Sequence, residues 1–554
     1  MPSALHSRTR HHESLDSTTQ IGADKLFRRA PRLLLFLLLI CLCRNGVAQA
    51  QESRSQKTPP KQDQKKPFVM EHRLAVPSFV EASPQLNGTW ETSPFMIPFN
   101  PVHVALMYTG RVLVISGSGN DPTNKVLEAG VWDPVPQTVR TFHIDWDMFC
   151  NGMTILPDGR PFVMGGTIQY LPNFLGYAKT ALFNPATEKF TNGPDMSGGR
   201  WYPTATMLGT GSAMVLSGLN DTTGATNTTV QFGNGTSWTA AGTVFSGVPL
   251  YPREHLLPNG KVFEDGANPD SQMFDTVSHT WTFVANTNFG VERDYGSSVL
   301  LPLTPADGYK PKVMILGGGN LGSTSTGTNT TELIDLSVAS PTWVNGPTMV
   351  GARVQMNATI LPNGKVLVSG GSNVNEDPTT AVLQAQLYDP STNAFTSAST
   401  MQFARTYHSN TLLLPNATVL AVGGNPVRGR ATYEPHIEVY KPAYLFDSTG
   451  KPAKRPVISA SPLASSTIKY GAAFAINTPD AASIKSVVLI RPGSVTHSFD
   501  MDQRLVGLAF TVAPGVLHAT VPSNHNLAPP GYYLLFILNA QGVPSVARFV
   551  RLGP

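Results

Sequence analysis

The stretch LPNGKVLVSGG (residues 361–371) decides the fold, because variants of it recur along the whole chain. It joins a Pro-Asn-Gly-Lys turn to a run of β-branched and aliphatic residues that ends in glycine. Close variants are TGRVLVISG (109–117), LPDGRPFVMGG (156–166) and LPNATVLAVGG (414–424). The last glycines of seven such copies lie 48 to 53 residues apart: Gly117, Gly166, Gly218, Gly266, Gly318, Gly371 and Gly424.

Most copies are followed by a short strand pattern, a turn such as VWDP, LFNP or LYDP, and an aromatic-containing strand pattern. Seven units of about 50 residues, each a small antiparallel sheet, match the kelch period. Helix signals are nearly absent. We therefore predict an all-β fold, with a seven-bladed kelch β-propeller at 85–445. The repeat then stops, and short β-rich runs separated by Pro and Gly turns over 455–554 predict an immunoglobulin-like β-sandwich.

The N-terminal segment has the pattern of an export signal. Basic residues precede the apolar run LLLFLLLICLC (33–43), and AQA follows at 48–50. Eleven apolar residues are far fewer than the roughly 20 that span a bilayer. We predict a signal peptide at 1–50 and, because residues 51–70 are polar and Lys-rich, a flexible linker at 51–84. The mature protein is then expected to be extracellular, or periplasmic in a bacterium, with no membrane attachment.

The charge of the chain excludes some partners. Residues 1–50 carry seven Lys or Arg against three Asp or Glu, which accounts for the whole chain's net charge of +4. The remainder is near neutral, so nothing indicates nucleic acid or an anionic membrane as a partner. Two of the three cysteines lie in the predicted signal, which leaves Cys150 without an intramolecular partner. It is either a buried small apolar residue or a reactive group.

Reactive side chains share one position within the repeat. In a propeller, equal repeat positions lie at equal height around the central channel. Sixteen residues before the marker glycine stand Cys150, Tyr202 and His408, and Tyr407 precedes His408. The same count in the other copies gives Pro101, Leu250, Pro302 and Gln355.

Neighbouring residues of a regular strand point to opposite faces, so Tyr407 and His408 are placed on the loop that enters the innermost strand. Phenolate oxygen and imidazole nitrogen in an open arrangement suit Cu(II) better than Zn or Ca. Two tyrosines and one histidine are too few ligands, and a second histidine is expected. The alternative is that Tyr407 and His408 only cap a strand.

Four longer stretches resemble the copper radical oxidases, most closely glyoxal oxidase and more distantly galactose oxidase. They are FCNGMTILPDGR (149–160), GGRWYPTATM (198–207), ARTYHSNTLLLPNATVLAVGGNP (404–426) and PGSVTHSFDMDQRLVGLAF (492–510). The resemblance extends from about residue 85 to the C-terminus. It implies a thioether between Cys150 and Tyr202, with Tyr202 as equatorial copper ligand and radical site. Tyr407 would be the axial ligand and proton acceptor, and His408 and His497 would supply two imidazoles.

In this resemblance His497 arrives on a loop of the C-terminal domain; the alternative is a residue of a surface hairpin. The cofactors implied are one copper ion and the built-in Cys150–Tyr202 crosslink. The implied activity is oxidation of small aldehydes of the glyoxal or methylglyoxal type, as hydrates, to carboxylic acids, with O2 reduced to hydrogen peroxide. We expect a monomer whose partners are this substrate and O2. Alternatives are a primary-alcohol or galactose-type oxidase, or a non-catalytic kelch module that binds a glycan or a protein.

Some neighbouring residues have two interpretations. Galactose oxidase stacks an indole from a later loop on its crosslinked tyrosine, and the corresponding loop SGLNDTTGAT (217–226) has no tryptophan. Trp201 either stacks near Tyr202 or packs between blades. Arg200 and Arg405 are expected to form ion pairs between blades; the alternative is that they bind substrate. The side chains of the YPREH stretch (251–255) either line the pocket or, as we favour, only pack.

Overall fold

The computed structural model describes residues 83–425, 432–462 and 465–553. The predicted signal peptide and residues 51–82 of the predicted linker lie outside these ranges. The described part is nearly all strand and turn, as predicted, with one four-residue helix α2 (Pro84–Asn87) and short 3-10 turns η2 (Pro305–Asp307), η3 (Pro378–Thr380), η4 (Ala443–Leu445) and η5 (Ala481–Ser483). Among these residues, no helix has the length and apolar character needed to cross a bilayer.

Seven antiparallel sheets form the predicted seven-bladed propeller. Blade 1 consists of β2 (His103–Leu106), β3 (Val112–Gly117), β4 (Glu128–Asp133) and β5 (Thr138–His143). Blade 2 consists of β6 (Gly152–Ile155), β7 (Pro161–Met164), β10 (Thr180–Asn184) and β11 (Lys189–Asn192). Blade 3 consists of β12 (Thr204–Met207), β13 (Ala213–Leu216), β14 (Thr229–Gly233) and β15 (Trp238–Thr243). A two-stranded hairpin, β8 (Thr167–Gln169) and β9 (Leu175–Gly176), is inserted in blade 2.

Blades 4 to 6 follow the same plan. Blade 4 consists of β16 (Glu254–Leu256), β17 (Val262–Glu264), β18 (Asp270–Asp275) and β19 (Thr280–Asn286). Blade 5 consists of β20 (Ser297–Leu300), β21 (Lys312–Leu316), β22 (Thr331–Asp335) and β23 (Trp343–Asn345). Blade 6 consists of β24 (Val354–Ile360), β25 (Val366–Ser372), β26 (Gln384–Asp389) and β27 (Ala394–Thr400). The repeated Pro-Asn-Gly-Lys motif makes the turn between the first two strands, where Gly364 has a φ of 82° that favours glycine.

Blade 7 closes the ring with strands from both ends of the propeller. It contains β28 (Asn410–Leu413), β29 (Val419–Val422), β30 (His436–Lys441) and the N-terminal strand β1 (Thr89–Met96). Trp90 of β1 lies opposite Tyr440 of β30, and its indole N–H donates to the Ser399 carbonyl of blade 6 at 2.9 Å. This pairing places the N-terminal strand, which precedes the first repeat, in the same sheet as the last repeat and so closes the ring.

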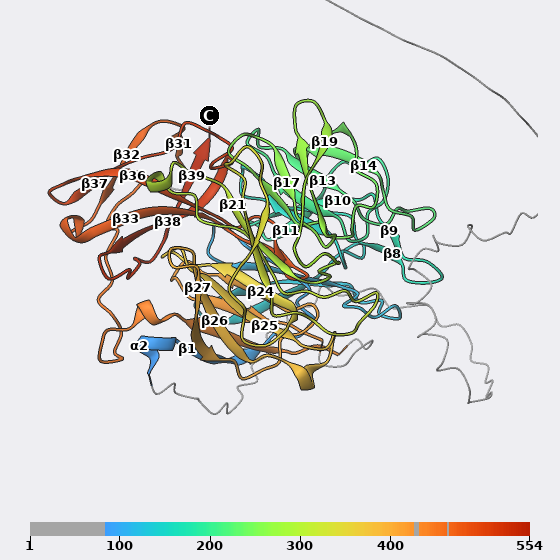
Figure 1. Ribbon diagram of the computed structural model, residues 1–554, viewed down its shortest axis with the longest axis horizontal. Helices are drawn as coiled ribbons and strands as arrows, with labels where there is room; N and C mark the ends of the chain where they lie inside the picture. Colours follow the sequence, from blue (N-terminus) through green and yellow to red (C-terminus); the bar gives the residue numbers. More distant parts are fainter. Residues whose placement is uncertain (1–82, 426–431, 463–464, 554) are drawn as a thin grey trace, which may run out of the picture. The chain divides into compact units, whose positions relative to one another are not determined.

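The C-terminal strands form the predicted sandwich. They are β31 (Thr467–Lys469), β32 (Ala473–Asn477), β33 (Ile484–Arg491), β36 (Arg504–Ala513), β37 (Val516–Thr520), β38 (Gly531–Asn539) and β39 (Arg548–Gly553), drawn in orange to red in Figure 1. The first half of β36 pairs with β33 and the second half with β37, so this long strand belongs to both layers. A separate apolar core that includes Ile476, Leu489 and Leu535 lies between the layers.

One hairpin of this C-terminal region joins the propeller. Strands β34 (Ser494–Thr496) and β35 (Phe499–Asp500) lie between β33 and β36 in the chain, yet β34 pairs with β2, the innermost strand of blade 1. His497 stands at the tip. The hairpin is anchored by the buried carboxylate of Asp502, which accepts hydrogen bonds from Thr154 Oγ1 at 2.7 Å, the Ile155 N–H at 2.8 Å and Arg491 Nε at 3.0 Å.

We predict that Asp502→Asn destabilises the protein by about 3–5 kcal/mol, because it leaves the buried Arg491 guanidinium without its counter-charge. Denaturant unfolding measures the effect. The control is Glu91→Gln, which removes a carboxylate from the exposed pair with Lys441 and should cost no more than about 1 kcal/mol. Equal losses in the two variants would contradict the anchoring role.

Candidate metal centre

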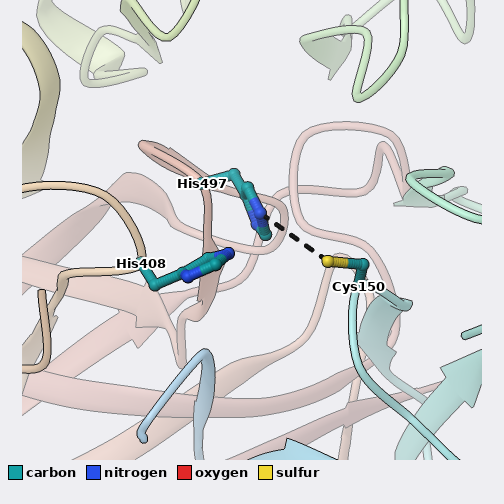
Figure 2. A group of neighbouring side chains, drawn as sticks. All are labelled: Cys150, His408 and His497. Atoms are coloured by element: carbon teal, nitrogen blue, oxygen red, sulfur yellow. Dashed lines mark hydrogen bonds between the residues drawn. The ribbon is translucent and has the colours of Figure 1, made fainter. Parts of the chain in front are cut away.

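The structure brings the predicted residues together. Cys150, Tyr202 and the pair Tyr407 and His408 lie in the turns that precede the innermost strands of blades 2, 3 and 7. The phenol oxygens of Tyr202 and Tyr407 contact each other. His497 Nε2 lies 3.0 Å from the Tyr202 oxygen and 4.0 Å from Cys150 Sγ. Figure 2 shows Cys150, His408 and His497 turned toward one another, and one potential ligand atom of each lies within 4.8 Å of the others.

The backbone of these turns has the irregularity that the sequence requires. Cys150, Tyr202, His408 and His497 have φ values of 62°, 68°, 64° and 47°, in the left-handed region that side chains other than glycine seldom adopt. A left-handed residue interrupts the alternation of a strand. Tyr407 and His408 therefore lie on the same side, with ring centroids 3.7 Å apart.

Blades 4, 5 and 6 have a left-handed residue in the same place: Tyr251, Tyr295 and Gln355. The sixteen-residue count selected Leu250 and Pro302 instead of the two tyrosines, because it assumed one length for every first hairpin. Tyr251 contacts the rings of Tyr202 at 4.4 Å and His497 at 4.5 Å, and Tyr295 lies edge-on to Tyr407 at 5.3 Å. An arginine stands two residues before the left-handed residue in several blades, as in RWY (200–202), RDY (293–295) and RVQ (353–355). This arginine is the sequence signal that could have predicted Tyr295.

Both imidazoles have the protonation state and the hydrogen bond that metal binding requires. His408 Nδ1 donates to Asn425 Oδ1 at 2.6 Å, and Nε2 is buried with no protein partner among the described residues. His497 Nδ1 is 2.6 Å from Thr496 Oγ1, and its Nε2 faces the Tyr202 oxygen. Burial lowers the pKa of His408 to about 3 and that of His497 well below its usual range. Neutral rings with one nitrogen held by a hydrogen bond are the form in which histidine ligates metals.

The phenol of Tyr407 and the thiol of Cys150 are held in their neutral forms. Burial, followed by the nearby Cys150 and Tyr170, raises the pKa of Tyr407 well above its usual range. Burial and the charge of Asp147 likewise raise the pKa of the Cys150 thiol. A neutral thiol is a poor metal ligand. Two phenol oxygens and two imidazole nitrogens are therefore the donor set that best fits a metal here, and it suits Cu(II).

Trp201 lies against Tyr202, with the two ring planes tilted by 33°. Its ring centroid lies 3.8 Å from that of Tyr202, and Phe174, from the loop between β8 and β9, stacks on its other side at 4.3 Å. The indole over this tyrosine therefore comes from the preceding residue. The loop at 217–226 contributes Leu219, which forms a bridge with Trp201.

The neighbouring charged residues have structural roles. Arg405 pairs with Glu438 at 2.8 Å within its own blade, and Arg200 donates to the carbonyls of Ser217 and Thr229, so the prediction of ion pairs between blades is wrong. In the YPREH stretch, Arg253 faces Asp265 at 3.7 Å and His255 Nε2 lies 2.7 Å from Ser298 Oγ. Both pack as expected, whereas Tyr251 contacts the site.

Comparisons with known proteins agree with this fold. The family model for the glyoxal oxidase N-terminus matches residues 123–444, and that for the galactose oxidase-like early set domain matches 455–552. The chain belongs to this family, the copper radical oxidases of the glyoxal oxidase and galactose oxidase type.

Individual relatives act on different substrates. Aldehyde oxidase GLOX of Vitis pseudoreticulata is 29% identical, over 86% of this chain and 99% of the relative. Galactose oxidase of Gibberella zeae is 28% identical, over 86% of this chain and 72% of the relative. A solved structure of a fungal alcohol oxidase of the AA5 family, in complex with copper, superposes with a TM-score of 0.74 at 26% identity and covers 84% of this chain and 100% of the other.

Copper(II) binding to the metal-free protein is expected to release protons, because Tyr407 is protonated before binding and a phenol must lose its proton to ligate a cation. Apparent copper affinity should therefore fall as the pH is lowered. Titration calorimetry in buffers of different ionisation enthalpy counts the released protons. Tyr407→Phe should release fewer; an unchanged count in this variant would contradict the assignment.

Proposed function

We propose that this protein is a secreted, monomeric copper radical oxidase that converts small aldehydes of the glyoxal or methylglyoxal type, as their hydrates, to carboxylic acids and reduces O2 to hydrogen peroxide. The observation that carries the proposal is the convergence of two phenols and two neutral imidazoles on one buried point beside Cys150. A non-catalytic kelch module would have no need of five such residues, four of them in strained backbone conformations.

Tyr202, Tyr407, His408 and His497 would hold the copper through their two phenol oxygens and two Nε2 atoms. Bound copper would supply a one-electron acceptor and a position for the substrate oxygen. Tyr407 then takes the proton of the substrate hydroxyl at its phenol oxygen, and Tyr202, as a phenoxyl radical, takes the hydrogen atom from the adjacent carbon. An aldehyde hydrate loses two electrons and two protons in becoming the acid, and O2 takes up both to give hydrogen peroxide.

The proposed Cys150–Tyr202 thioether rests on how the two residues lie. The Tyr202 N–H donates to the Cys150 carbonyl at 3.0 Å, so their backbones are adjacent, and both side chains belong to one buried cluster. Forming the bond removes the thiol hydrogen and one ring hydrogen, and O2 accepts the two electrons and two protons as hydrogen peroxide. Once bonded to the Tyr202 ring, the Cys150 sulfur would no longer be a free thiol and would resist the oxidation that free thiols undergo.

The choice of aldehyde over alcohol is supported by the glyoxal oxidase family model and by the aldehyde oxidase relative, which this chain covers almost completely. The galactose oxidase relative and the fungal alcohol oxidase structure support a primary alcohol as the second candidate substrate.

A substrate panel tests the proposal. Copper-loaded mature protein is expected to produce hydrogen peroxide from methylglyoxal and glycolaldehyde with a kcat/KM at least about tenfold above that for galactose or simple primary alcohols, a difference of ~1.4 kcal/mol in transition-state binding. The opposite order would establish the alcohol oxidase. No peroxide from any member of the panel would leave only a binding role.

Tyr202→Phe is expected to lower turnover by about 10³-fold or more, which corresponds to ~4 kcal/mol, because phenylalanine supplies neither the oxygen ligand nor the radical. Copper binding should be partly retained through His408, His497 and Tyr407, and copper titration measures this. An active Tyr202→Phe variant would refute the radical assignment. Cys150→Ala is the companion variant, since it keeps all four proposed ligands but cannot form the thioether.

A further inference from the structure

Backbone hydrogen bonds link the left-handed residues of neighbouring blades. The Tyr202 N–H donates to the Cys150 carbonyl at 3.0 Å, and the Tyr251 N–H donates to the Tyr202 carbonyl at 2.9 Å. The Gln355 N–H donates to the Tyr295 carbonyl at 2.8 Å in the same way. At each of these junctions, the N–H of one left-handed residue is satisfied by the carbonyl of its counterpart in the preceding blade.

Blade 1 cannot supply that carbonyl to Cys150. Its counterpart position is Pro101, whose ring holds φ near −65° and excludes the left-handed conformation. The Pro101 carbonyl accepts Asn410 Nδ2 of blade 7 at 2.6 Å instead. The Cys150 N–H donates to a side chain, His103 Nε2, at 3.1 Å. His103 is the first residue of β2 and is 0% exposed.

The direction of this bond determines the state of the imidazole. A backbone N–H only donates, so His103 Nε2 is unprotonated and Nδ1 bears the hydrogen of a neutral ring. The His103 ring centroid is 6.2 Å from that of His497, and His103 does not belong to the group of Cys150, His408 and His497 whose ligand atoms converge. His103 therefore acts on the site through the Cys150 backbone.

We propose that His103 is a positioning residue for thioether formation: its Nε2 replaces the missing backbone acceptor of blade 1 and so holds Cys150 in the conformation that presents Sγ to the Tyr202 ring. This rests on the proposed Cys150–Tyr202 bond. With an apolar residue at 103, the Cys150 N–H is buried without an acceptor, and only the bond from the Tyr202 N–H to the Cys150 carbonyl remains to hold its φ of 62°. The turn then relaxes and the sulfur leaves its reactive position.

The experiment follows the loss of two hydrogens by intact mass after copper(II) and O2 are added to protein that was expressed and purified without copper. His103→Leu and His103→Met, which lack the acceptor, are expected to form the crosslink about tenfold or more slowly than the wild type. His103→Gln, whose amide oxygen can accept the Cys150 N–H, should stay within about threefold. Copper stoichiometry should be unchanged in all three, because His103 is not a ligand.

His255→Leu is the matched control. It removes another buried imidazole of an inner strand, one that bonds Ser298 and not the Cys150 backbone, and it should crosslink at the wild-type rate. Wild-type crosslinking rates in folded, copper-loaded His103→Leu or His103→Met would overturn the proposal. It also fails if neither of these variants folds while His255→Leu does, since His103 is then a residue of the fold. No mass loss in the wild type would instead refute the proposed crosslink itself.

Discussion

The left-handed backbone of the turns that enter the innermost strands is the constraint on which the rest of the site depends. Each such residue other than glycine costs roughly 1–2 kcal/mol, and a bulky side chain makes the conformation still rarer. Six of the seven blades nevertheless have one, and His497 adds a seventh on the hairpin. Such strain persists only where surrounding structure over-determines it. At three junctions a hydrogen bond joins one left-handed residue to its counterpart in the preceding blade, so that relaxing one of these turns would break the bond to its neighbour.

The second domain completes the site. Propeller turns alone provide two phenols, one thiol and one imidazole, and the remaining imidazole arrives on the β34–β35 hairpin. The hairpin is held where β34 extends the blade 1 sheet and where Thr496 Oγ1 donates to the Val102 carbonyl at 2.9 Å. Asp502, five residues beyond His497, fixes its base against β6. Since β6 directly follows Cys150, the same contacts position the histidine and the thiol relative to each other.

The blades were predictable because the turn motif and the closing glycine repeat with each sheet, whereas their closure by β1 was not, since it depends on a strand that lies outside the repeat. Repeat phase identified Cys150, Tyr202 and His408, but only the family resemblance identified His497, because no count from the propeller reaches another domain. His103 carries no signal in the sequence alone, because it acts through a single bond between blades. The place of Trp201 next to Tyr202 suggested a ring contact, but the sequence left packing between blades open, and the contact with Tyr202 settles it.

The electrostatics of the site explain why copper, and not a hard cation, suits it. The convergent group found among the described residues contains no carboxylate. The nearby carboxylate of Asp147 already accepts the N–H groups of Ser118 and Phe149 at 2.8 and 3.0 Å. Calcium and magnesium require several such oxygens, so neither is favoured. The neutral Tyr407 phenol and the neutral imidazoles avoid the cost of buried charge until a metal binds. A cation that binds nitrogen well and displaces a phenolic proton is therefore favoured at this site.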